Sequence, residues 1–149
     1  MSVLPPSRPV LILLVEDNEG DVLMTREAFE EGKVAVDLDV CESGQQAIDH
    51  LSAAMSAAGP PLPDMVLLDW NLPGRPGIDV LRWIRSTPST EHLPVVVLTT
   101  SRAPEDVLSA YRSQANSFIT KPVNADDFLG AIRSLESYWL TVVALPGRV

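Results

Sequence analysis

Four short apolar runs, each ended at once by a charged or hydroxyl residue, constrain this chain more than any other feature. The run Met65–Leu68 leads into Asp69 and then into a Pro-Gly turn. The other runs are Val10–Val15 before Glu16 and Asp17, Pro94–Leu98 before Thr99, and Ser117–Thr120 before Lys121. Unbroken apolar runs of this length are typical of strands buried on both faces of a parallel sheet. We therefore expect the polar side chains to stand at the carboxyl ends of such strands.

Amphipathic segments separate these runs and predict the fold class. We expect a further edge strand over Val34–Val40 and helices over Glu19–Glu31 and Gln45–Ala54. Three more helices are expected: one that ends before Pro88, one that begins at Pro104, and one that begins after Asn124. Five strands alternating with five helices predict an α/β fold with a doubly wound, five-stranded parallel sheet. Right-handed crossovers give the expected strand order 2-1-3-4-5, as in flavodoxin-like folds.

Length and charge narrow the class of protein. A chain of 149 residues fits a single domain, 1–149, with a buried core. The net charge of −9 argues against a nucleic-acid surface. The longest apolar run is far shorter than the ~18 residues of a membrane span, so we expect no membrane partner. Cys41 is the only cysteine, which fits a reducing, cytoplasmic location.

The strand order predicts a site where the carboxyl ends of strands 1 and 3 meet. Glu16, Asp17 and Asp69 are expected to converge there, with Thr99 and Lys121 arriving from the next two strands. Three adjacent carboxylates repel one another, and Mg²⁺ is the ion such oxygen clusters favour. Taken singly, each residue has a plainer explanation, such as a helix cap or a backbone-bonded hydroxyl. Five matched strand ends together favour an aspartate phosphorylation site.

Other kinds of site find no support in the sequence. There is no P-loop motif and no dinucleotide-binding glycine pattern. His50 and His92 lack cysteine partners at zinc-site spacing. No histidine stands where a base for a serine hydrolase triad is needed.

These residues resemble the receiver domain of two-component response regulators over roughly Val10 to Glu136. The spacing from Asp69 to Thr99, and from Thr99 to the pair Lys121-Pro122, is that of the family. The resemblance implies a cis Lys-Pro bond and a protein that accepts a phosphoryl group, not an enzyme with its own substrate. It also implies roles for individual residues: Asp69 as phosphoacceptor, Lys121 as phosphoryl-binding cation, Glu16, Asp17, Asp69 and Asn71 as the Mg²⁺ site, and Thr99 with Phe118 as the switch pair.

A narrower resemblance concerns the stand-alone regulators of bacterial phytochrome histidine kinases. It depends on the segments Asn18–Asp21, Val95–Ser101, Ala115–Pro122 and Ser137–Pro146. It implies a sensor histidine kinase as partner, and a downstream phosphotransfer protein as a further candidate. Two alternatives stay open: a phosphatase or phosphotransferase with an aspartate nucleophile, and a binding module without phosphorylation. The first usually carries an acid two residues after the nucleophile, where this chain has Asn71.

The apolar residues of the carboxyl-terminal tail predict that the protein associates with a second copy of itself. We expect the domain core to span 10–136 and the segment 137–149 to extend the last helix. The tail carries the apolar residues Tyr138, Trp139, Leu140, Val142, Val143 and Leu145. One helix face buries fewer residues than this, so we expect a homodimer, present before phosphorylation. It should be built on the fifth helix and its extension, with neighbouring surface of the fourth helix or fifth strand. The alternative is that the tail folds back over its own domain.

Overall fold

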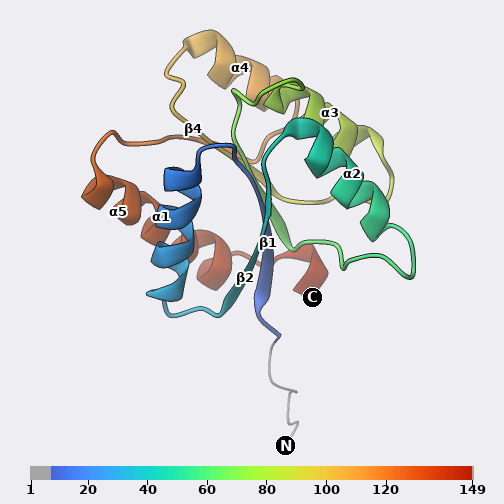
Figure 1. Cartoon of the computed structure of the whole chain (residues 1–149), viewed down its shortest axis with the longest axis horizontal. Helices are drawn as coiled ribbons and strands as arrows, with labels where there is room; N and C mark the ends of the chain where they lie inside the picture. The colour runs from blue at the N-terminus through green and yellow to red at the C-terminus, as the bar shows by residue number, and fades with distance from the viewer. Residues whose placement is uncertain (1–7, 149) are drawn as a thin grey trace, which may run out of the picture.

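A five-stranded parallel sheet forms the centre of the protein. The computed structural model describes residues 8–148 and has the strand order β2-β1-β3-β4-β5 (Figure 1). The strands are β1 (Val10–Val15), β2 (Val36–Cys41), β3 (Met65–Leu68), β4 (Val95–Thr99) and β5 (Ser117–Thr120). The helices are α1 (Glu19–Glu30), α2 (Gly44–Ala54), α3 (Gly77–Ser86), α4 (Pro104–Arg112) and α5 (Ala125–Leu135). The predicted fold class and strand order are confirmed.

The sheet separates two apolar cores. Helices α1 and α5 cover one face, and α2, α3 and α4 cover the other (Figure 1). Along β1, the side chains of Ile12 and Leu14 enter the α1–α5 core, whereas Leu13 and Val15 enter the opposite one. Because both faces are covered, every residue of β1, β3 and β4 is buried. This explains why these strands are apolar without alternation.

The helix starts follow local capping chemistry. The side chains of Asn18, Ser43 and Asn124 each accept a hydrogen bond from the backbone N–H three residues on, which caps α1, α2 and α5. Pro104 occupies the first turn of α4, where a missing N–H is harmless. The strand β2 lies at the sheet edge as expected, but it begins at Val36 and ends at Cys41, later than predicted. Its register against β1 fixes these ends.

Helical structure continues beyond α5 in a wider winding. A π-helical segment η1 spans Glu136–Val142, and a short 3₁₀ turn η2 follows at Pro146–Arg148. The backbone N–H of Val143 accordingly bonds the carbonyl of Tyr138 at 3.0 Å. The tail folds back far enough to bury Leu145 in the α1–α5 core.

This return path covers part of the tail's apolar surface with the chain's own core. Trp139 and Leu140 are partly buried against the α1–α5 core, beside the buried Leu145. Tyr138 and Val142 stay 58% and 72% exposed. The carboxylate of Glu136 is buried as well, and one of its oxygens accepts the Lys33 N–H at 2.9 Å.

The two ends of the described chain meet below the sheet, at the amino ends of β1 and β3 (Figure 1). Arg8 forms two bonds with the buried carboxylate of Asp64, at 2.9 and 2.8 Å. The same guanidinium donates to the carbonyl of Gly147 at 3.3 Å. Asp64 also accepts the Leu11 N–H at 2.9 Å, which fixes it to β1.

Candidate functional site

Three carboxylates converge at the carboxyl ends of β1 and β3. Glu16 and Asp17 directly follow β1, and Asp69 follows β3. The strands lie side by side, and the Asp69 N–H bonds the carbonyl of Val15 at 3.0 Å. One oxygen from each carboxylate lies within 4.8 Å of the others, as a shared cation requires. Glu16 and Asp69 are buried, whereas Asp17 is exposed.

Lys121 is the buried cation of this cluster. Its ammonium donates to Glu16, to Asp21 at 2.9 Å and to Asp69 at 3.4 Å. The backbone N–H of Lys121 bonds the carbonyl of Thr99 at 2.7 Å, which ties it to the end of β4. The expected cis bond is not present: residues 8–148 contain no cis peptide, so Lys121-Pro122 is trans.

The charges in the cluster do not balance. Burial raises the pKa of Glu16 to about 7, against the opposing effect of the Lys121 bond and with a contribution from the charge of Asp69. Burial lowers the pKa of Lys121, but the bonds to Glu16 and Asp21 and the charge of Asp69 outweigh it and raise the pKa. One ammonium therefore faces a surplus of carboxylates. A divalent cation is the addition that best relieves this repulsion.

Asp21 is the site residue that the sequence analysis did not assign. It lies in the first turn of α1, four residues after Asp17, and reaches Lys121 from the helix. Its position in the sequence could have placed it at the site, because the first turn of a helix that follows a strand faces the carboxyl edge of the sheet. It was not assigned because an acid in the first turn of a helix is already explained by its favourable interaction with the helix dipole.

Asn71 lies at the rim of the same site. It is exposed, and its N–H donates to Asp69 Oδ1 at 3.3 Å. A hollow of about 520 Å³ opens above the cluster. The residues lining it are Glu16, Asp17, Asn18, Glu19, Asp21, Asp69, Asn71, Thr100 and Lys121.

The two expected switch residues, at the end of β4 and within β5, have no hydrogen bond to the acids. Thr99 is fully buried, and its hydroxyl accepts only a long 3.4 Å bond from the Ser101 N–H. Phe118 is half-buried against the core under α2–α4. Its backbone N–H donates to the hydroxyl of Tyr111 at 3.2 Å, which links β5 to α4.

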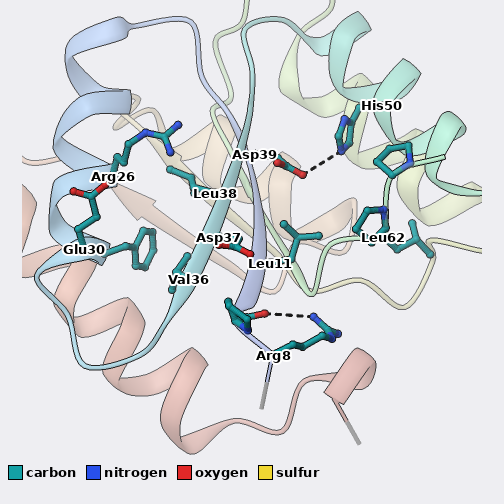
Figure 2. A pocket seen from close by; sticks show the side chains of 14 residues that line it. Arg8, Leu11, Arg26, Glu30, Val36, Asp37, Leu38, Asp39, His50 and Leu62 are labelled. Atoms are coloured by element: carbon teal, nitrogen blue, oxygen red, sulfur yellow. Dashed lines mark hydrogen bonds and ion pairs between the residues drawn. The ribbon is translucent and has the colours of Figure 1, made fainter. Parts of the chain in front are cut away.

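A larger hollow than the one above the acids lies elsewhere. It measures about 880 Å³ and runs along the free edge of β2, between α1 and the loop after α2 (Figure 2). Its lining mixes apolar side chains with charges of both signs, including Asp37, the Asp39–His50 pair and Arg26. Charged side chains of this kind protect an exposed strand edge from pairing with other chains, which accounts for the groove without a ligand.

Comparison with known proteins identifies relatives over most of the chain. A family model described as "Response regulator receiver domain" matches residues 12–133. Response regulator Rcp1 of Synechocystis sp. is 36% identical over 138 residues, covering 93% of this chain and 94% of that protein. The probable methanogenesis regulatory protein FilR2 of Methanothrix harundinacea is 36% identical over 145 residues, with 97% and 93% covered.

Solved structures give the same relationship. The Mn²⁺-bound form of Rcp1 has a TM-score of 0.86 at 35% identity, covering 93% of this chain and 99% of that one. The phosphorylated cyanobacterial phytochrome response regulator RcpA has a TM-score of 0.86 at 33% identity, with the same coverage. Within residues 8–148, no helix has the length and apolar character needed to span a membrane.

Proposed function

Because this chain belongs to the response regulator receiver family, we propose that Asp69 accepts a phosphoryl group from a phosphohistidine of a sensor histidine kinase. The observation that carries the proposal is the meeting of Glu16, Asp17 and Asp69 around the Lys121 ammonium. A carboxylate held beside a fixed cation, at the open edge of the sheet, suits attack on phosphorus.

The donor set fits Mg²⁺. Four oxygen ligands are available from Asp17, Asp69, Glu16 and the backbone carbonyl of Asn71. The exposed Asp17 is the best direct ligand, because the protein has not already buried it. Glu16 is buried and bonded to Lys121 and to the Asn18 N–H, which suits it to a supporting role. When bound, the ion supplies positive charge to the transferring phosphoryl oxygens.

The transfer needs little beyond positioning. An Asp69 oxygen attacks phosphorus while the P–N bond to the donor imidazole breaks, and its electron pair returns to that nitrogen. Lys121 already stands 3.4 Å from Asp69 Oδ2, within a small movement of the incoming oxygens. The backbone N–H of Asn71 holds the other oxygen of Asp69 in place. The protein thereby assists its own phosphorylation and the later hydrolysis, without being an enzyme with a separate substrate.

Signalling follows from Thr99 and Phe118. The weakly bonded Thr99 hydroxyl is free to turn to a phosphoryl oxygen, and Phe118 then follows into the vacated space. Movement of β5 alters the Tyr111 contact with α4, and with it the outer surface of α4 and β5. A second conformation stabilised by new contacts to the phosphoryl group meets the requirement for a population shift.

The partners follow from the family and its relatives. A phytochrome histidine kinase is the proposed donor, because RcpA is a phytochrome response regulator and the tail and site loops resemble such proteins. FilR2 is equally similar to this chain, so the pairing depends on these local segments more than on overall identity. We further propose a single receiver domain, cytoplasmic, that forms a homodimer and passes the signal to a downstream phosphotransfer protein or another protein partner.

The test is phosphorylation of the full chain by acetyl phosphate with Mg²⁺. Trp70 is buried directly after Asp69, so its fluorescence should report metal binding and phosphorylation. Mass spectrometry should find one added phosphoryl group, at Asp69 and only with a divalent ion present. Asp69→Asn is the control, and uptake by this variant at the wild-type rate would refute the assignment. Turnover of a phosphate ester would favour the phosphatase alternative, and no uptake would favour a binding module.

A further inference from the structure

Three arginines line one hollow at the end of the molecule away from Asp69. The hollow measures about 520 Å³ and lies between the carboxyl ends of α3 and α4. We name it the arginine pocket; its lining residues are Arg82, Arg85, Ser86, Arg112, Ser113 and Gln114. No carboxylate is among them. This is unexpected in a chain with 20 acidic and 11 basic residues.

Arg85 is built into the pocket as a fixed group. Its guanidinium donates to the backbone carbonyls of Gln114 at 3.0 Å, Glu91 at 3.0 Å and Leu93 at 2.7 Å. A fourth bond goes to the side chain of Asn116 at 3.0 Å. All these acceptors are neutral, so they orient the charge without cancelling it. Burial lowers the pKa of Arg85, and no carboxylate opposes that effect.

The helix ends account for only part of this charge. Arg85 and Arg112 lie in the last turns of α3 and α4, where cations offset the helix dipole. Each helix end carries the equivalent of about −0.5 charge, so two ends offset about one of the three positive charges. Arg82, one turn before Arg85 on the same face of α3, is not in a last turn. Neither Arg82 nor Arg112 forms an ion pair within residues 8–148.

Gln114 adds a strained position to the same pocket. It has φ of 72°, and no other described residue except Gly74 has positive φ. Glycine is the usual residue just after a helix end in this conformation. The chain instead carries a side chain with an amide donor at this position, where it lines the hollow. Strain of this kind is most often kept where a side chain has a function.

We propose that the arginine pocket binds a phosphate-bearing anion. The surplus of about two positive charges matches a phosphate dianion, and guanidinium groups with nearby hydroxyls are the donors that phosphate oxygens prefer. The lining has no aromatic ring to hold a nucleotide base, so recognition rests on the phosphate group. This site is separate from the phosphorylation site and does not depend on the proposed function.

The experiment titrates the full chain with inorganic phosphate and with glycerol 3-phosphate at constant ionic strength, in EDTA so that the metal-dependent site does not contribute. Calorimetry should give saturable binding. Arg82→Gln and Arg112→Gln should each weaken it at least about fivefold. Arg26→Gln, which changes another exposed helix arginine, should alter it less than about twofold. Unchanged thermal unfolding of the arginine variants confirms that they fold.

A variant of Gln114 and a comparison of anionic ligands provide two further tests. Gln114→Gly should raise the unfolding temperature, because it relieves the strain, yet weaken phosphate binding, because it removes the amide. The tighter of the two phosphate probes identifies free phosphate or a phosphate ester as the natural class. Binding of a polyglutamate peptide without binding of either phosphate probe overturns the proposal in favour of a protein contact. Absence of saturable binding, or equal loss in Arg26→Gln, also overturns it.

Discussion

The carboxylate of Asp21 accepts a 2.9 Å hydrogen bond from the ammonium of Lys121, although the two residues are 100 positions apart in the sequence. Lys121 is therefore divided among Glu16, Asp21 and Asp69 before any phosphoryl group arrives. The phosphoryl donor must compete with Asp21 for the ammonium. It must also approach against the negative charge of Asp21.

Asp21→Asn should accordingly speed phosphorylation by acetyl phosphate. We expect an increase of about three- to tenfold at fixed Mg²⁺, since removing one partly exposed charge is worth ~1 kcal/mol. The measurement is the rate of Trp70 fluorescence change. Glu19→Gln is the matched control, because Glu19 lines the same hollow but has no bond to Lys121. Equal acceleration in both variants would show a general charge effect, and a slower Asp21→Asn would contradict the competition.

Glu16 should make the metal-free protein less stable as pH rises. Its folded pKa of about 7 lies above the ordinary value of 4.5, so the folded state binds more protons. The contribution of Glu16 to the free energy of unfolding is then fully present below pH 4.5. It is lost progressively as the pH rises through 7, by at most about 3 kcal/mol. Mg²⁺ should restore it, with a larger rise in unfolding temperature at pH 8 than at pH 5. Glu16→Gln should remove most of this slope in EDTA; an unchanged slope would exclude Glu16 as its source.

Thr99 and Lys121 should separate signalling from chemistry. Thr99→Ala removes only a hydroxyl, so phosphate uptake should fall little, whereas Lys121→Ala removes the fixed cation and should lower uptake by at least about tenfold. Hydrogen exchange of β5 and α4 is the readout of switching, because the Phe118 N–H is bonded to Tyr111. Phosphorylated Thr99→Ala should keep the exchange pattern of the unphosphorylated protein. A wild-type change in its pattern would rule out Thr99 as the switch.

Gly32 should not tolerate a side chain. A Cβ at this position would clash with an oxygen of Glu136, whose carboxylate is buried. Gly32→Ala should therefore lower the free energy of unfolding by about 1–3 kcal/mol. Gly130→Ala is the control: nothing lies within 4 Å of a Cβ in the middle of α5, so it should stabilise by about 0.5–1 kcal/mol. Denaturant unfolding measures both, and equal effects would show that the contact with Glu136 is unimportant.

The homodimer needs a test that leaves the core intact. Deleting the tail would remove the buried Leu145, so loss of a dimer after deletion would be ambiguous. Tyr138→Glu with Val142→Glu changes only exposed side chains. We expect this variant to sediment as a monomer at micromolar concentration, whereas the wild type sediments as a dimer. Leu23→Glu, an exposed apolar position on α1, should leave the dimer unchanged; a monomeric wild type would refute the proposal.

Local sequence rules predicted the strands and their order, because each depends on neighbouring residues or on handedness. The same rules placed the three acids at one sheet edge. They failed for Asp21, since a first-turn acid has an equally good role as a helix-end charge. They also failed for the π-helical winding after Leu135. That winding accompanies a contact between Glu136 and Lys33 across 103 positions, which periodicity within the tail does not encode.

The arginine pocket is a second feature that sequence patterns did not predict. Arg82 and Arg85 are visible in the sequence as one helix face, but their lack of carboxylate partners depends on the packing of α3 against the turn after α4. Gln114 gave no signal of positive φ, because glutamine is an unusual residue there. Such features come from tertiary contacts, which local sequence patterns do not encode.

Arg8, at the start of the described chain, donates hydrogen bonds to Asp64 just before β3 and to the carbonyl of Gly147 near the other end. This junction lies at the amino ends of the strands, whereas Asp69 lies at their carboxyl ends. A fluorescent protein or affinity tag joined next to Arg8 or Gly147 would therefore emerge from the pole opposite the acids and leave the approach of a kinase clear. The closeness of Arg8 and Gly147 also makes the chain a good subject for circular permutation, with new ends placed in an exposed loop such as 56–60.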